Sequence, residues 1–262
     1  MKSQMYRLLM NRIFGMVGGG YPIFARWITD FDCNHKTSWW NVIKDTPFDI
    51  TSLKAKRRYE INKGNKFFDV TVLDYNKHAG DLYEVYEASR RGLPEHLRLT
   101  TAGKKYFESL FNDLEHSYIF GAYFKETGCL EGFALFRKYG RYLGFNSLKT
   151  NIEAEKYNVN FALINYALNY FKDELFAGCY IDDGSRPIFH TTTHFQDFLE
   201  KYFEFRKAYS HLHVVYRPGV NFIVKCLFPF RKIFLKIKNK YFQEIYGVLL
   251  QEEFIQNDRI AK

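Results

Sequence analysis

Three consecutive segments with strand-like composition, joined by short turns, constrain the fold of this chain most strongly. Residues 118–124, 130–137 and 142–148 are rich in aromatic and aliphatic side chains, and turns containing Gly128 and Gly140 separate them. Apolar runs of this length with glycine in the connections are typical of antiparallel hairpins. The sequence therefore predicts a meander of three antiparallel strands near the centre of the chain.

Helix-like and strand-like segments also alternate on both sides of this meander. Helices are predicted over 81–91, 102–114, 158–171 and 192–202, and further strands over 21–28, 67–73, 176–181, 205–209 and 212–216. From residue 67 the order is strand, two helices, three strands, helix, strand, helix and two strands. This order predicts an α+β fold in which helices flank a central mixed, mostly antiparallel sheet.

Composition limits the class of protein. Of 262 residues 47% are hydrophobic, which suffices for a packed core, and no run approaches the roughly 18 uncharged apolar residues of a membrane-spanning helix. Arg7 and Arg12 interrupt the apolar positions of the N-terminus, so a cytoplasmic location is expected. The four cysteines form no C-x-x-C pair. His190 and His194 have helical spacing but lack a third ligand, so no metal site is expected.

The formal charge of +9 is concentrated in two segments. Residues 51–66 hold six cations and one acid, and residues 225–240 hold six cations and no acid. These windows together carry +11, so the rest of the chain sums to −2. Concentrated positive charge favours an anionic partner such as a phosphorylated ligand, a nucleic acid or an anionic membrane.

The order of elements and two motifs carry a family resemblance. The segment 52–64 (SLKAKRRYEINKG) precedes the first core strand, and the segment 203–209 (FEFRKAY) opens the closing strand pair. With the element order, these segments resemble the GNAT N-acyltransferase superfamily, in particular its FemAB-like, peptidoglycan-bridge-type branch. The resemblance implies an N-terminal extension over 1–66, an acyltransferase core over 67–218 and a basic helix and tail over 219–262.

The resemblance implies catalysis where the strand over 176–181 ends. An amine must lose a proton as it attacks a thioester, and Asp183 and His190 follow that strand as candidate general bases. The alternative is structural, because Asp182-Asp183-Gly184 is also a turn sequence and threonines can cap the next helix. Sheet splaying near 143–148 and 179–183 is expected to admit the donor.

The resemblance further implies an acyl coenzyme A donor, in the first place acetyl coenzyme A, as a co-substrate rather than a permanently bound cofactor. The glycine-rich pyrophosphate loop of standard GNAT enzymes is missing from 149–160. Candidate donor-binding residues are Leu148, Lys149, Lys156, Asn158, Val159 and Asn160. An aminoacyl-tRNA donor, as in the best-known FemAB-like proteins, and a non-catalytic binding protein of the same fold are the two alternatives.

Partners follow from the two basic segments. The first basic segment and Arg186 predict contacts to donor phosphates or to an anionic acceptor. The alternative is that the segment forms a basic helix that only faces solvent. These candidate substrate-binding residues are Lys54, Arg57, Arg58, Lys63 and Arg186. The expected acceptor is a small molecule or an envelope precursor bearing an amine. A basic amphipathic helix over 230–241 predicts either peripheral contact with the inner face of a membrane or packing on the core.

Overall fold

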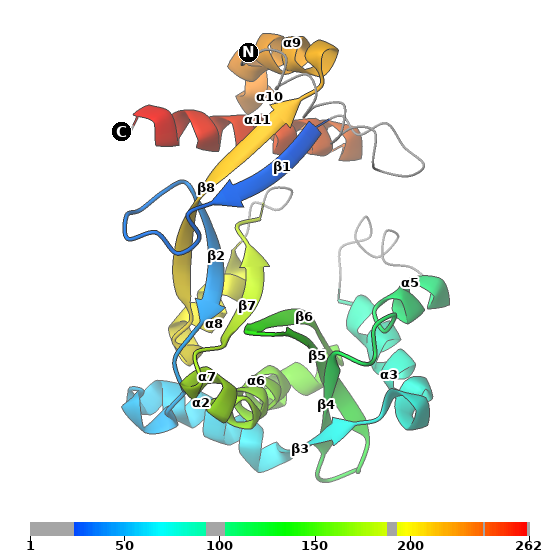
Figure 1. The fold of residues 1–262 in the computed structure, drawn as a ribbon. Helices are drawn as coiled ribbons and strands as arrows, with labels where there is room; N and C mark the ends of the chain where they lie inside the picture. Colours follow the sequence, from blue (N-terminus) through cyan, green and yellow to red (C-terminus); the bar gives the residue numbers. More distant parts are fainter. Residues whose placement is uncertain (1–23, 93–102, 188–192, 238, 261–262) are drawn as a thin grey trace. The chain divides into compact units, whose positions relative to one another are not determined.

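The computed structural model describes residues 24–92, 103–187, 193–237 and 239–260 (Figure 1). The chain forms two compact units. Unit 1 comprises residues within 1–41, 185–194 and 207–262, and unit 2 comprises 42–184 and 195–206. The predicted domain boundaries at 66 and 218 stay a prediction, although the basic segment before the first core strand belongs to unit 2.

Unit 2 contains the predicted meander. Strands β3 (Phe68–Leu73), β4 (Ser117–Phe124), β5 (Leu130–Tyr139) and β6 (Tyr142–Thr150) pair in sequence, each antiparallel to the next. Strand β7 (Tyr180–Ser185) adds to β6 in parallel. The sheet is thus mixed and mostly antiparallel, which confirms the predicted fold class.

Helices cover both faces of this sheet, which explains why the strands β4 and β5 are almost continuously apolar. Phe133 and Leu135 of β5 pack in one cluster with the helices α3 (Tyr75–Arg90) and α5 (Lys104–Ser109). The neighbouring Phe136 points to the other face, where its ring lies 5.5 Å from Phe171, directly after α6 (Val159–Tyr170). Alternate residues of β5 therefore belong to two different cores. Figure 1 shows α3 and α6 on opposite sides of the strands.

The remaining elements of unit 2 are short helices and one basic helix. They are the 3₁₀ helices η1 (Ile50–Ser52) and η2 (Ile152–Tyr157), and the α-helices α2 (Ala55–Phe67), α7 (Lys172–Phe176) and α8 (His194–Phe203), of which His194 falls in unit 1. Helix α2 carries the first basic segment and packs on α6.

Unit 1 combines a strand pair with C-terminal helices. Strand β1 (Phe24–Thr29) pairs antiparallel with β8 (Arg206–Tyr216), and β2 (Trp39–Lys44) begins in this unit. The helical elements are α9 (Pro218–Leu227), η3 (Phe228–Phe230), α10 (Arg231–Lys236) and α11 (Lys240–Ile260). Buried Trp39, Leu212 and Phe254 form one apolar cluster, and Tyr216, Val224 and Leu249 form a second.

Most predicted elements occur, but several differ from the prediction. The expected strand over 176–181 begins only at Tyr180, because 172–176 are helical and Gly178 turns the chain with a φ of 80°. The two strands expected over 205–209 and 212–216 form a single strand, β8. No turn interrupts it at Ser210, because the carbonyl of Ser210 accepts a hydrogen bond from Thr37 Oγ1 at 2.8 Å. Strand β2 was not predicted. Positions 21–23 of the first predicted strand lie outside the described residues.

The C-terminal basic segment also differs from the prediction. The prediction of a single helix over 230–241 is wrong, because α10 ends at Lys236 and a separate helix, α11, begins at Lys240. Phe234 of the predicted apolar stripe packs against Phe242 and the second cluster, whereas Phe230, Ile233 and Tyr241 are exposed. Among the described residues, no helix has the length and apolar character needed to span a membrane.

Candidate active site

A cavity of about 450 Å³ lies in unit 2 where β6 and β7 diverge. The parallel register joins Tyr142 to Tyr180 and ends with Gly144 opposite Asp182, although both strands continue beyond these residues. The separation matches the splaying expected from the sequence. Residues from β6, β7 and neighbouring helices line the cavity: Tyr106, Leu110, Phe145, Asn146, Ser147, Leu148, Lys149, Thr150, Glu155, Asn160, Asp183 and Phe195.

Asp183 is the titratable group at the point of divergence. It follows the last paired residue of β7, and its side chain lines the cavity. Burial, and then the negative charge of neighbouring Asp182, raise the pKa of Asp183 to about 8, while a hydrogen bond with Gln196 opposes the shift. A carboxyl group with a pKa in this range is a stronger base than an ordinary carboxylate and exchanges protons near neutral pH.

The local turn holds the two carboxylates in different environments. Asp182 is buried, and its Oδ1 accepts a hydrogen bond from the backbone N–H of Gly184 at 2.8 Å. Gly184 has a φ of 107°, a conformation that residues with a Cβ rarely adopt. Gln196 of α8 is also buried and donates from Nε2 to the carbonyl of Gly184 at 3.3 Å. This turn directs Asp183, rather than Asp182, into the cavity.

Lys149 supplies positive charge to the same cavity. It lies on β6, opposite Phe133 of β5, and burial lowers the pKa of its ammonium group. Within the described part of the chain, no carboxylate lies within ion-pair distance of Lys149. Asn160 also lines the cavity, and its buried Oδ1 has no hydrogen-bond partner among the described residues. These groups provide a cation and an acceptor for a bound ligand.

The first turn of α6 is closely covered by the basic helix α2. A Cβ built on Gly64 would lie 2.5 Å from the carbonyl oxygen of Asn158, so only glycine permits this approach. Asn158 Nδ2 donates to the carbonyl and the carboxylate of Glu60, at 2.9 and 2.8 Å. Lys63 Nζ donates to the carbonyl of Lys156 at 2.8 Å. The helix N-terminus that binds pyrophosphate in standard GNAT enzymes is therefore packed against protein here.

The structure brings together only some of the predicted site residues. Asp183, Leu148, Lys149 and Asn160 line one cavity. Val159 is fully buried, and Lys156 and Asn158 contact α2 as described. His190 lies outside the described residues.

The predicted substrate-binding cations are spread over both units. Lys54 is exposed at the start of α2, and Arg57 is partly exposed on the same helix. Arg58 donates to the carbonyls of Thr51 and Leu53. Arg186 belongs to unit 1, where its guanidinium lies between the rings of Trp40 and Phe254, 4.3 and 3.9 Å from their centroids. None of the predicted cations except Lys149 lines the cavity.

Two residues at or beside the cavity, Phe195 and Gln196, escaped the sequence analysis. Gln196 follows Thr193 by three residues, which is the spacing of a helix capping box. This pattern does not indicate that Gln196 contacts Asp183. Phe195 packs its ring 5.8 Å from Phe145 and forms an apolar wall. Glu155 accepts from Thr150 Oγ1 at 3.4 Å and places a negative charge at the cavity.

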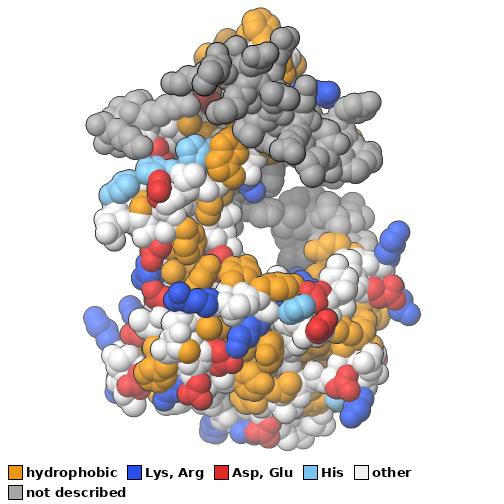
Figure 2. All heavy atoms as spheres, viewed as in Figure 1, with side chains coloured by type: hydrophobic (Ala, Val, Ile, Leu, Met, Phe, Trp, Pro, Cys, Tyr) orange, Lys and Arg blue, Asp and Glu red, His pale blue; other side chains and the backbone are white. Residues whose placement is uncertain are grey.

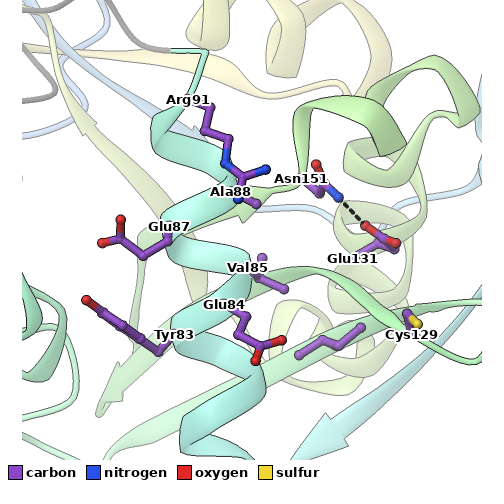
Figure 3. A pocket seen from close by; sticks show the side chains of 10 residues that line it. Tyr83, Glu84, Val85, Glu87, Ala88, Arg91, Cys129, Glu131 and Asn151 are labelled. Atoms are coloured by element: carbon purple, nitrogen blue, oxygen red, sulfur yellow. Dashed lines mark hydrogen bonds between the residues drawn. The ribbon is translucent and has the colours of Figure 1, made fainter.

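A second cavity of about 420 Å³ lies beside α3 and has a different character (Figure 3). Tyr83, Glu84 and Glu87 come from α3, and Glu131 of β5 accepts from Asn151 Nδ2 at 2.8 Å. Three carboxylates disfavour a phosphorylated ligand because like charges repel. The divergence of β6 and β7, rather than this acidic cavity, is the candidate active site.

In unit 2 the sheet opens between the parallel strands β6 and β7, with the carboxyl group of Asp183 at the opening. No family model and no curated protein sequence matches the chain. The crystal structure of FemX matches it with a TM-score of 0.55 at 10% sequence identity, over 84% of this chain and 78% of FemX. This likeness shows that the chain shares the fold of FemX, in agreement with the FemAB-like resemblance of its sequence.

Two further solved structures match more weakly. L-PGS from Bacillus licheniformis gives a TM-score of 0.48 at 12% identity, over 85% of this chain and 69% of that protein. A GCN5-related N-acetyltransferase-like protein from Streptococcus suis gives a TM-score of 0.38 at 14% sequence identity, over 82% of this chain and 68% of that protein.

Proposed function

We propose that this chain is an N-acyltransferase that moves an acyl group, in the first place acetyl, from acyl coenzyme A to an amine. The cavity between β6 and β7 takes the thioester arm of the donor, and the acceptor is an amine of a sugar, an amino acid or a cell-envelope precursor. The single observation that carries this proposal is Asp183, whose carboxyl group with a raised pKa lies where the paired strands separate.

The reaction requires removal of a proton from the acceptor. As the amine nitrogen bonds to the thioester carbon, the ionised Asp183 carboxylate accepts a proton from that nitrogen. The tetrahedral intermediate then collapses, the carbon–sulfur bond breaks, and the thiolate leaves and takes up a proton. Burial that raises the pKa of Asp183 makes its carboxylate a better base, at the cost of a smaller ionised fraction at neutral pH.

Lys149 is proposed to interact with the donor. Its ammonium group has no carboxylate partner within the described chain, so a phosphate or the developing oxyanion can serve as its counter-charge. Among the described residues, no strand pairs with β6 beyond Gly144 on its β7 side, and the backbone groups of this edge are proposed to bind the amides of the donor arm.

An aminoacyl-tRNA donor is the second candidate, and a specific observation favours it. Because α2 packs on the first turn of α6 through Gly64, the usual pyrophosphate position is covered. Lys54, the N-cap of α2, and Lys56 and Lys66 within the helix are exposed and give α2 a cationic surface suited to an RNA backbone.

Isothermal titration calorimetry with acetyl coenzyme A and with total tRNA separates the two donors. The leading proposal predicts micromolar binding of acetyl coenzyme A that is weakened in Lys149→Met. The second candidate predicts tRNA binding that falls steeply with salt, as expected from counterion release. Absence of binding in both titrations would support a non-catalytic protein and contradict both proposals.

Peripheral attachment to the inner face of a membrane forms a further part of this proposal. Phe222 and Ile223 of α9 are 71% and 54% exposed, and Lys225 and Lys232 are exposed on the same helical cluster. Figure 2 shows hydrophobic side chains at the surface near α9. Exposed apolar groups beside cations suit an anionic bilayer, to which each cation near the surface adds about 1 kcal/mol.

Flotation with vesicles tests the membrane contact. Wild-type protein is expected to float with phosphatidylglycerol vesicles at low salt and not with phosphatidylcholine vesicles. The double variant Phe222→Ser, Ile223→Ser should stay unbound, while Phe176→Ser, which removes an exposed aromatic ring of unit 2, should float like wild type. Equal flotation of all three proteins, or of none, would contradict the proposed surface.

A further inference from the structure

Two histidines and a cysteine of unit 1 meet at the β1–β2 connection, outside the candidate active site. Cys33 and His35 belong to this connection, and His211 lies on β8. Their potential ligand atoms, the sulfur and one nitrogen of each ring, all lie within 4.8 Å of one another. Figure 2 shows histidine side chains grouped at the surface beside this connection.

The backbone holds these three residues together. Thr29, the last residue of β1, pairs with His211, so the connection starts beside the histidine. Asp30 and Asp32 then adopt left-handed conformations, with φ of 54° and 61°, which turn the chain sharply. The backbone N–H of Cys33 donates to the carbonyl of Tyr209 at 2.9 Å, which fixes the connection over β8.

We propose that Cys33, His35 and His211 bind a divalent transition-metal ion, Zn²⁺ in the first place. One thiolate and two imidazoles form a ligand set that zinc prefers, and three protein ligands leave a fourth position for water. In a tetrahedral site with zinc–nitrogen bonds of about 2.0–2.1 Å, two nitrogens lie roughly 3.3–3.4 Å apart. His35 Nε2 and His211 Nε2 lie 3.2 Å apart.

The same atoms form weaker contacts without a metal. A hydrogen bond between two imidazole Nε2 atoms requires that one ring carries the proton there and the other offers a lone pair. Cys33 Sγ donates to the carbonyl of His35 at 3.4 Å. Metal binding replaces both contacts: each imidazole offers a lone pair, and the thiol releases its proton to solvent as its sulfur bonds to the metal.

The neighbouring His213 provides a matched control. It lies two residues after His211 on β8, but its Nε2 is 2.8 Å from Thr29 Oγ1 and its ring stacks on Trp27 at 5.3 Å. It is not part of the cluster. Cys226 is an exposed free cysteine of the same unit and serves as the matched control for the thiol.

Titration of the purified, metal-free full chain with Co²⁺ tests the site. One equivalent of Co²⁺ should bind and produce a sulfur-to-cobalt charge-transfer band, and Zn²⁺ should displace it. Cys33→Ser should abolish the band, and His211→Ala should weaken binding more than about 100-fold, beyond the loss typical of an outer-shell substitution. Cys226→Ser and His213→Ala should bind like wild type.

The proposal is overturned if wild-type protein shows no stoichiometric binding, an outcome that does not depend on the folding of any variant. Retention of the charge-transfer band in Cys33→Ser would also overturn it. Circular dichroism of each variant establishes that a lost band reflects the missing ligand rather than unfolding. None of these outcomes depends on acyltransferase activity.

Discussion

Replacement of Asp183 by asparagine should change how the stability of the protein depends on pH. The pKa of this carboxyl group is raised from 3.8 to about 8, so the folded protein binds its proton between these values and the unfolded chain does not. The proton therefore stabilises the folded state fully below pH 3.8, and this contribution is lost as the pH rises to about 8. At 1.36 kcal/mol for each pH unit, the loss over these roughly four units amounts to about 6 kcal/mol.

Urea unfolding of wild type and Asp183→Asn between pH 5 and 9 measures this effect. Asparagine does not ionise and resembles the neutral acid in size, so the variant should lose less stability with rising pH and be the more stable protein at pH 9. Asp173→Asn, which neutralises an exposed carboxylate on α7, should keep the wild-type slope. A slope in Asp183→Asn equal to that of wild type would refute the raised pKa.

Three further outcomes follow from the same geometry. Turnover should rise with pH to a midpoint near 8, the pKa of Asp183, and fall at least about 100-fold in Asp183→Asn, as measured by acyl-transfer rates from pH 6 to 9.5. Lys149→Met should raise the donor Kd at least about tenfold in calorimetry, whereas Lys156→Met, outside the cavity, should not. Gly64→Ala should destabilise the protein by about 1–3 kcal/mol, because the added Cβ meets a backbone carbonyl. Gly80→Ala, with open space around it on α3, should stabilise it by up to about 1 kcal/mol, and thermal unfolding compares the two.

Local patterns predicted the meander well, because glycine turns and dense apolar runs are properties of neighbouring residues. The same patterns failed where contacts with residues distant in the sequence determine the local structure. The carbonyl of Ser210 bonds to Thr37, so β8 continues through a sequence that resembled a turn. Gly178 ends a short helix before β7, although the preceding Phe176 suggested a strand.

The candidate site was likewise predictable only in part. Asp183 was predicted because it follows a strand in a known order of elements. Its raised pKa was not predictable, since it arises first from burial, which depends on elements distant in the sequence, and the hydrogen bond with Gln196 of α8 opposes it. Lys149 was expected among the donor-binding residues, but the covering of Asn158 by Gly64 depends on a contact between α2 and α6 that no local pattern indicates.

Hydrogen exchange with and without acetyl coenzyme A tests most directly whether the donor enters between β6 and β7. We expect slower amide exchange in peptides covering 145–150 and 182–184, which flank the divergence of the strands. Peptides covering 83–91 of α3, at the acidic cavity, should exchange at unchanged rates. Protection at α3 with none along β6 and β7 would contradict the proposed active site.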